Sequence, residues 1–433
     1  MSPRLQALAE KPWHVALLLG FAALILFGYN LGIPSKHVFD EVHYVPAAQA
    51  LIDLSGPLNK EHPLVAKELI GLGMLIFGDN GFGWRIMPCL AGVATVVAGF
   101  ALLWLLTRRM RPAVVGALLL MLDQMLFVLA RIAMLDVFLG AFLMWGMVAM
   151  VWAMKAATPR QALWRWVLGS ALLGLAVGVK WAAIPYVAFA GLAFLFVRLR
   201  DARLAKRPVA GALTGKDQPH WPGLATVPAL LIMGAVSIAV YFLTFLPAFF
   251  YYENPLTPAT LIPFQQEMYA LQTQILAPHT YQAKWYSWPL ILRPIWAFYE
   301  YYDGAQRGVL VIGNPLIMWG GLLAVIACVV AWFRSRAIVP LVMALLWFAS
   351  LAIYIVIPKS LGFYYYYHLS AIFLCLALAV AFDHFDGGRK RGLEEWFLAA
   401  SLLMFGYFYP IIAGMPLSGP QSFNSWMWFQ SWR

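Results

Sequence analysis

Residues 338–357 read IVPLVMALLWFASLAIYIVI, a run of 20 residues without a charged side chain. Because an α-helix of about 20 residues crosses the hydrocarbon core of a bilayer, this run predicts a membrane-spanning helix. Similar runs recur along the chain, without the alternation that is typical of outer-membrane β-strands. We therefore predict an all-α polytopic membrane protein with about eleven transmembrane helices, at 13–33, 83–106, 113–130, 134–154, 165–179, 181–198, 224–247, 309–333, 338–357, 361–382 and 395–413.

The composition leads to the same class. Of 433 residues, 63% are hydrophobic and 11% are charged, whereas soluble domains carry about 25% charged residues. A water-soluble fold of this size would lack polar side chains to cover its surface, which excludes a cytosolic enzyme, a secreted domain and a disordered chain. The three cysteines, Cys89, Cys328 and Cys375, lie inside apolar runs without paired or metal-like spacing, so we interpret them as core residues.

The basic residues predict the orientation. A net charge of +11 is compatible with nucleic acid or anionic lipid as a partner. With a cytoplasmic N-terminus, however, 19 of the 30 Lys and Arg residues fall in short inside segments, which is the positive-inside pattern. We therefore expect no nucleic-acid partner and a multi-pass protein of the cell (inner) membrane, and we expect 13–33 to be a retained anchor rather than a cleaved signal peptide.

The same orientation defines the domain organisation. We predict a single membrane-embedded domain over 1–433, with two long loops, 34–82 and 248–308, at the periplasmic or extracellular face. Both loops are rich in Pro, aromatic and charged residues, and we expect short amphipathic helices in them. Since titratable groups are costly near a membrane unless they pair or line a wet cavity, we expect an outward-facing site, and an enzyme more than a channel.

Two adjacent carboxylates, Asp40 and Glu41, open the first loop. On a helix their side chains point about 100° apart, so they would face different partners. One of them could accept a proton from an acceptor hydroxyl while the other binds a second group. The alternative interpretation is a helix N-terminus, where acidic residues are also favoured.

Further candidates lie where other spans meet the outer surface. His62 and Lys67 could meet an anionic head group or anchor the loop at the interface. Arg131 and Asp136 form either a simple ion pair or a phosphate-binding arginine oriented by the carboxylate. Lys180, which follows Gly178, is explained better by a phosphate site than by snorkelling to the lipid head groups.

The C-terminal half adds aromatic and titratable candidates. The segment from His279 to Trp296 is typical of an amphipathic interface segment or of a polypeptide or sugar platform. Lys359, Tyr366 and His368 belong to a Tyr-rich cluster, which also fits an ordinary aromatic belt. A divalent metal held by Glu41 with a loop histidine stays an option, although the spacing shows no metal-ligand pattern.

Taken in order, these segments resemble the protein O-mannosyltransferase family, particularly its bacterial members. The similar blocks are Asp40-Glu41, His62-Pro63 to Lys67, Arg131 to Asp136, Gly178-Val179-Lys180-Trp181, His279 to Trp296, Gly313-Asn314-Pro315 and the Tyr-rich run ending at His368. The chain departs from the pattern at Leu64, where a second Pro is usual, and at Lys359, where the family often has Arg. The order is kept from about residue 15 to residue 385, and the last span and tail match no block.

The resemblance implies a GT-C type glycosyltransferase that moves mannose from a polyprenyl-phosphate carrier to Ser or Thr hydroxyls of an acceptor protein outside the cytoplasm. It implies Asp40 as general base and Glu41 as a substrate-binding partner. Its blocks also place the donor phosphate on Arg131, Lys180, Lys67 and Lys359, and the substrates on His62, Asp136, His279, Tyr366 and His368. Two other functions stay open, namely a GT-C transferase that modifies a lipid or glycan, and a transporter or flippase. The latter predicts internal repeats with interrupted helices, which the sequence does not show.

Overall fold

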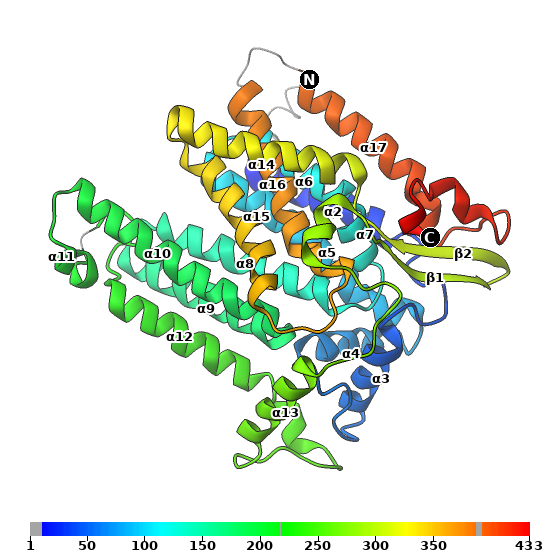
Figure 1. Ribbon diagram of the computed structural model, residues 1–433. Helices are drawn as coiled ribbons and strands as arrows, with labels where there is room; N and C mark the ends of the chain where they lie inside the picture. Colours follow the sequence, from blue (N-terminus) through cyan, green and yellow to red (C-terminus); the bar gives the residue numbers. More distant parts are fainter. Residues whose placement is uncertain (1–10, 217, 387–391) are drawn as a thin grey trace.

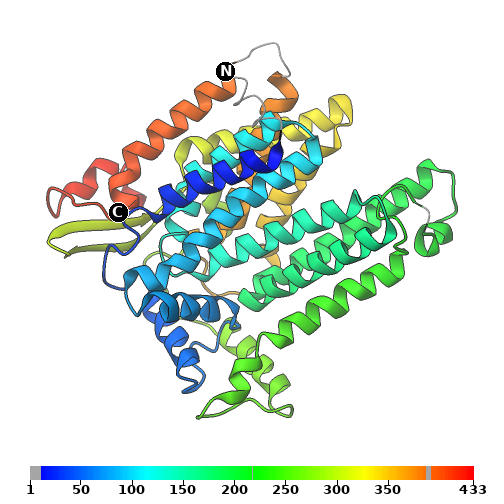
Figure 2. The same ribbon diagram turned by 180° about the vertical axis from the view of Figure 1, so that it is seen from behind.

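The structure is a computed structural model that describes residues 11–216, 218–386 and 392–433. Four of the basic residues counted above, Arg4, Arg389, Lys390 and Arg391, lie outside the described residues. The long helices form a bundle (Figures 1 and 2). Its principal helices are α2 (Pro12–Gly28), α5 (Gly81–Thr107), α6 (Met110–Leu122), α8 (Leu135–Met154), α9 (Pro159–Val179), α10 (Ile184–Leu204), α12 (Thr226–Leu243), α14 (Pro315–Ser335), α15 (Ile338–Val356), α16 (His368–Asp386) and α17 (Leu393–Ile412).

The polytopic helical class is confirmed, whereas the number of spans is not. Among the described residues, nine helices are long and apolar enough to cross a membrane. Two of the eleven expected spans correspond to shorter apolar helices, α2 with 17 residues and α6 with 13. The central helix is α16, which is buried along most of its length, as the heart of a bundle requires.

The span expected at 113–130 is interrupted, for a local reason. Asp123 ends α6, and its carboxylate accepts hydrogen bonds from the main-chain N–H groups of Met125 and Leu126, so that it caps the short helix α7 (Gln124–Leu129). The amide of the next residue, Gln124, donates to the carbonyl of Met404. A hydropathy pattern does not reveal a capping carboxylate inside an apolar run.

The all-α expectation also misses a β-hairpin. Strands β1 (Ile295–Tyr302) and β2 (Ala305–Val311) pair antiparallel around Asp303 and Gly304, which both have positive φ as a tight hairpin turn requires. The span expected at 309–333 therefore starts only at Pro315, where Asn314 caps α14. The amide of Asn314 also donates to the carbonyls of Leu122 and Ser401, which ties the start of α14 to α6 and α17.

The outer elements gather at one end of the bundle. Helices α3 (Glu41–Ile52), α4 (Val65–Phe77) and α13 (Leu261–Thr273) lie at the same end as the hairpin, opposite α11 (Val209–Thr214), in both views (Figures 1 and 2). Main-chain hydrogen bonds join the loops around α3 and α13, from Tyr252 N–H to the Leu54 carbonyl and from Glu253 N–H to the Ser55 carbonyl. The two long loops therefore form one connected layer, and the candidate site lies beneath it.

Candidate active site

A cavity of about 150 Å³, here called the lysine cavity, lies where this outer layer meets the bundle. Helix α13 contributes Tyr269, Gln272 and Thr273 to its wall. Its charged and polar lining comes from His62, Asp136, Lys180, Tyr354, Lys359 and Tyr366. Four separate segments of the predicted site thus converge on one cavity.

Lys180 is held in the cavity wall by Asp136. The ammonium donates a 2.7 Å hydrogen bond to the Asp136 carboxylate, and both side chains are almost fully buried. Lys180 directly follows the end of α9. Gly178 allows α4 to pack closely against this end of α9, because a Cβ at position 178 would lie 2.7 Å from a Val65 methyl group. Asp136 therefore pairs with Lys180 and not with Arg131, which corrects both interpretations of the Arg131–Asp136 block given above.

A second lysine, Lys359, shares one tyrosine, Tyr366, with Lys180. The Lys180 ammonium lies 5.3 Å from the Tyr365 ring centre and 5.5 Å from that of Tyr366. Lys359 approaches Tyr366 from its own segment, 5.2 Å from the ring centre and 3.4 Å from the hydroxyl. Burial, together with the like charge of Lys180, lowers the pKa of Lys359 to about 8. Two ammonium groups and one carboxylate thus line this cavity, and the excess of positive charge suits an anion.

Asp40 lies near this pair, outside the lining of the lysine cavity, and among the described residues its Oδ1 accepts no hydrogen bond. It is the N-cap residue of α3, and its Oδ2 accepts a 3.5 Å hydrogen bond from the Tyr365 hydroxyl. Burial raises the pKa of Asp40 above its ordinary value, and the positive charge of Lys180 opposes that rise. Tyr365 thus contacts both the Asp40 carboxylate and Lys180, which is a geometry suited to a general base next to an anion site.

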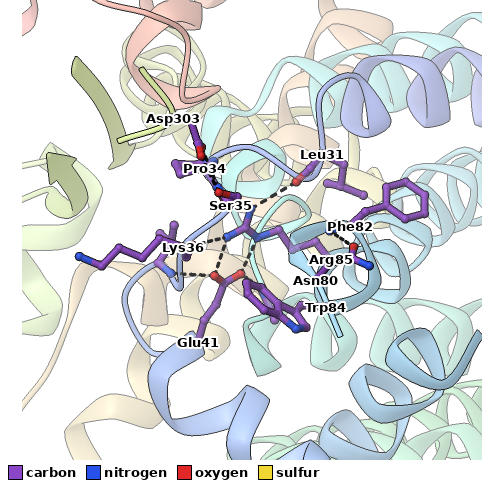
Figure 3. A network of polar contacts seen from close by, with 12 residues as sticks. Leu31, Pro34, Ser35, Lys36, Glu41, Asn80, Phe82, Trp84, Arg85 and Asp303 are labelled. Carbon is purple, nitrogen blue, oxygen red and sulfur yellow. Dashed lines mark hydrogen bonds and ion pairs between the residues drawn. The ribbon is translucent and has the colours of Figure 1, made fainter. Parts of the chain in front are cut away.

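Glu41, one residue later, is sealed inside the protein (Figure 3). Its carboxylate accepts hydrogen bonds of 2.7 Å from Arg85 Nε and Nη2 and from the main-chain N–H groups of Val38 and Ala133. Arg85 also donates hydrogen bonds to the carbonyls of Leu31, Pro34 and Lys36. The side chains of Glu41 and Arg85 are both fully buried. The pair therefore fixes the loop that carries Asp40, and no Glu41 oxygen is left for a substrate or a metal.

The hairpin supports the same loop from outside. The Asp303 carboxylate accepts hydrogen bonds from the Ser35 main-chain N–H and hydroxyl at 2.8 and 2.5 Å (Figure 3). Lys36 forms an exposed 2.6 Å ion pair with Glu300 of β1. The loop before Asp40 is thus held by Arg85 on its buried side and by the hairpin on its solvent side.

Two basic residues expected to bind phosphate contact the main chain instead. Arg131 donates to the carbonyls of Phe27 and Tyr29 at 2.6 Å, at the C-terminal end of α2 where carbonyls lack helical partners. The Lys67 ammonium donates to the carbonyls of Asn59 and His62 at 2.5 and 2.8 Å, and burial lowers its pKa to about 7. Both cations stabilise backbone ends, and neither lines the lysine cavity.

The three histidines of the prediction differ in environment. His62 lines the lysine cavity, and its Nδ1 is buried with no hydrogen-bond partner among the described residues. Neither ring nitrogen of buried His368 has a partner in the described part of the chain. His279 is exposed beside Phe363 and Tyr281 and lies outside the cavity lining. Within residues 11–216, 218–386 and 392–433, no three His, Cys, Asp or Glu side chains are placed to hold a metal ion.

Sequence reasoning missed Arg85 and Tyr365. Arg85 lies in the apolar run 83–106, and a charged residue in such a run is by itself a signal for a specific partner. Tyr365 belongs to the Tyr-rich run already singled out, but its contact with Asp40 spans 325 residues and no local pattern encodes it.

Comparison with known proteins gives one consistent result. Two family models match the chain in succession. Residues 45–253 match the model described as dolichyl-phosphate-mannose-protein mannosyltransferase, and residues 257–432 match the C-terminal four TMM region of protein-O-mannosyltransferase. A polyprenol-phosphate-mannose–protein mannosyltransferase of Mycobacterium tuberculosis is 27% identical over 98% of this chain and 92% of its own length. The relative with that name from Corynebacterium glutamicum is also 27% identical, over 92% of this chain and 88% of its own length.

Solved structures share the fold. The Saccharomyces cerevisiae protein O-mannosyltransferase Pmt1-Pmt2 complex, bound to the sugar donor, superposes with a TM-score of 0.81 at 14% identity, covering 100% of this chain and 94% of that one. ArnT from Cupriavidus metallidurans, bound to undecaprenyl phosphate, gives 0.56 at 15% identity, covering 93% and 70%. The expected GT-C type of fold is thereby confirmed. Since the two family models follow one another and together cover most of the sequence, the chain belongs to the protein O-mannosyltransferase family.

Proposed function

We propose that this enzyme transfers a mannosyl group from a polyprenyl-phosphate carrier to Ser or Thr hydroxyls of a protein at the outer face of the membrane. The observation that carries the proposal is the juxtaposition of Asp40 with the Lys180–Asp136 pair and Lys359 around Tyr365 and Tyr366. Family membership and the names of the mycobacterial and corynebacterial relatives support the same donor and the same class of acceptor.

The chemistry follows from these groups. A hydroxyl is a poor nucleophile near neutral pH, so the Asp40 carboxylate takes its proton as the oxygen attacks the anomeric carbon. The bond from that carbon to the phosphate oxygen breaks, and the polyprenyl phosphate leaves with the bonding electron pair. Lys180 and Lys359 stabilise the charge that develops on the phosphate. A single direct displacement of this kind inverts the anomeric centre.

We propose different duties for the remaining candidates. Glu41 positions Asp40 through Arg85, while Arg131 and Lys67 hold the backbone that frames the site. His62 and Tyr366, which line the lysine cavity, contact the sugar or the phosphate, and His279 acts further out, on the acceptor side. His368 is buried outside the cavity lining, so we assign it no contact with a substrate. The first long loop, 34–82, then carries the catalytic base, and the second, 248–308, covers the cavity.

The placement in the membrane is part of the proposal. The positive-inside distribution supports a cytoplasmic N-terminus in the inner membrane, with Asp40 at the periplasmic or extracellular face. Labelling of a cysteine introduced at Gly304, at the tip of the hairpin, by a membrane-impermeant maleimide in intact cells would support this orientation. Labelling only after lysis would contradict it.

Sugar transfer tests the function directly. The purified full chain in lipid nanodiscs, given polyprenyl-phosphate mannose and the periplasmic proteins of a deletion strain, should place hexose on Ser or Thr, as mass spectrometry of peptides would show. Hexose found in lipid or glycan fractions and on no protein would refute the proposed acceptor. Transport of the donor without any transfer would refute the enzyme.

A further inference from the structure

A second cavity of about 420 Å³, here called the loop cavity, adjoins the lysine cavity. It lies between the two long loops, and its wall includes Lys60, His62, Tyr251, Leu256, Phe264 and Glu267. His62 lines both cavities, so the two cavities meet at this residue. The mechanism proposed above leaves the loop cavity without a role.

The two cavities differ in what they can bind. The lysine cavity is small and bears two ammonium groups, which suits a sugar phosphate. The loop cavity has a volume in the range of ligand sites, about 300–1,000 Å³. It combines the apolar and aromatic side chains of Tyr251, Leu256 and Phe264 with titratable groups on the opposite loop. A wall with both apolar and polar groups suits a polypeptide, which carries side chains and main-chain amides.

A lipid tail fits this cavity poorly. A polyprenyl chain there would cover the exposed Lys60–Glu267 ion pair with hydrocarbon, and removing an ion pair from water costs free energy. A polypeptide, by contrast, supplies main-chain donors and acceptors, with which the polar side chains of this wall can form hydrogen bonds. The wall also contains an exposed ion pair, Lys60 to Glu267 at 2.9 Å, that links the two loops.

We propose that the loop cavity binds the acceptor polypeptide in an extended form and presents its hydroxyl past His62 to the lysine cavity. This assignment rests on the proposed function, because it takes a protein as the acceptor. It divides the substrates between the cavities, with the donor phosphate at Lys180 and Lys359 and the acceptor between the 57–67 segment and α13.

Helix α13 provides a matched pair of test positions. Thr260, its N-cap residue, lines the loop cavity, and Thr273, its last residue, lines the lysine cavity. The native cysteines Cys89, Cys328 and Cys375 are buried, so a maleimide added to the folded protein reacts at an introduced cysteine. Thr260→Cys and Thr273→Cys, each made in the full chain and labelled with a bulky maleimide in nanodiscs, are compared with their own unlabelled forms.

Labelled Thr260→Cys should raise the KM for a Thr-containing acceptor peptide by about tenfold or more, while the Kd for polyprenyl-phosphate mannose stays the same. Labelled Thr273→Cys should instead weaken donor binding. An unchanged peptide KM in labelled Thr260→Cys, or a loss of donor binding there, would overturn the assignment of the loop cavity. An unlabelled enzyme that mannosylates no protein would refute the proposed function instead, so the two failures are distinguishable.

Discussion

Asp40 and Glu41 are neighbours in sequence, yet they belong to two different regions. Around Glu41, Arg85 and Arg131, nearly every charged donor ends on a main-chain carbonyl or on a fully bonded carboxylate. Around Asp40, Lys180 and Lys359, charged groups meet tyrosines and a cavity. The first region holds the shape of the loop, and the second keeps charge available for a ligand. A buried charge therefore signals chemistry here only where its hydrogen-bonding capacity is left unfilled.

Replacing the base should have the largest effect. Asp40→Asn keeps the size of the side chain but cannot accept the hydroxyl proton, so we expect transfer to fall by about 10²–10⁴-fold. Donor binding and thermal unfolding should stay near those of the wild type, since the Glu41–Arg85 pair is untouched. Initial rates of mannose transfer to a peptide, with donor binding measured separately, check this. Wild-type turnover in Asp40→Asn would remove Asp40 as the base.

A cation from each region sharpens the contrast. Lys180→Met should lower kcat by about 10²–10³-fold because the departing phosphate loses a stabilising charge. Lys180→Met alone leaves the Asp136 carboxylate without its ion-pair partner. The double variant Lys180→Met with Asp136→Asn removes that unpaired charge, and its kcat should stay as low as that of Lys180→Met. Arg131→Met should lower the unfolding temperature yet leave the KM for the donor unchanged in the folded fraction. A donor defect that is specific to Arg131→Met would reverse the assignment of the two regions.

The buried pair should matter for stability more than for substrate binding. Glu41→Ala leaves the Arg85 guanidinium buried without its carboxylate, so we expect a loss of about 3–5 kcal/mol in the free energy of unfolding. The matched control is Lys36→Ala, which breaks the exposed pair with Glu300 and should cost about 1 kcal/mol or less. Denaturation of both variants in the same detergent checks the prediction. Equal losses would show that the Glu41–Arg85 pair does not hold the loop.

The smallest expected effect is a pH dependence. Because burial and Lys180 lower the pKa of Lys359 to about 8, its ammonium is lost as the pH rises through that value. The kcat/KM for the donor should therefore fall above about pH 8. Lys359→Arg should extend activity to higher pH, since a guanidinium stays protonated. On the acid side, activity should be lost as Asp40 becomes protonated. Because burial raises the pKa of Asp40, this loss should occur at a higher pH than for an ordinary aspartate. An alkaline limb that persists in Lys359→Arg would assign it to another group.

Much of the fold was open to prediction from sequence, because an apolar run long enough to span a bilayer has few alternatives. The places where these apolar runs are interrupted could not be predicted. Asp123 caps a helix inside an apolar run, and the 295–311 segment pairs with itself as strands, and both outcomes depend on partners that hydropathy does not weigh. The short helices α2 and α6 likewise fall outside a simple count of spans.

The candidate site divides in the same way. The approximate location of Asp40, His62, Lys180 and Lys359 could be predicted, because each lies in a segment between two apolar runs. Their partners could not be. Whether a cation faces a cavity or a carbonyl is decided by packing across distant segments, as the contact of Arg131 with the end of α2 shows.

A structure of the full chain with bound polyprenyl-phosphate mannose tests the central claim most directly. The account predicts phosphate oxygens within about 3 Å of the Lys180 and Lys359 ammonium groups, with the anomeric carbon turned toward the Asp40 carboxylate. A phosphate seated on Arg131 or Lys67, or a sugar that faces away from Asp40, would contradict it.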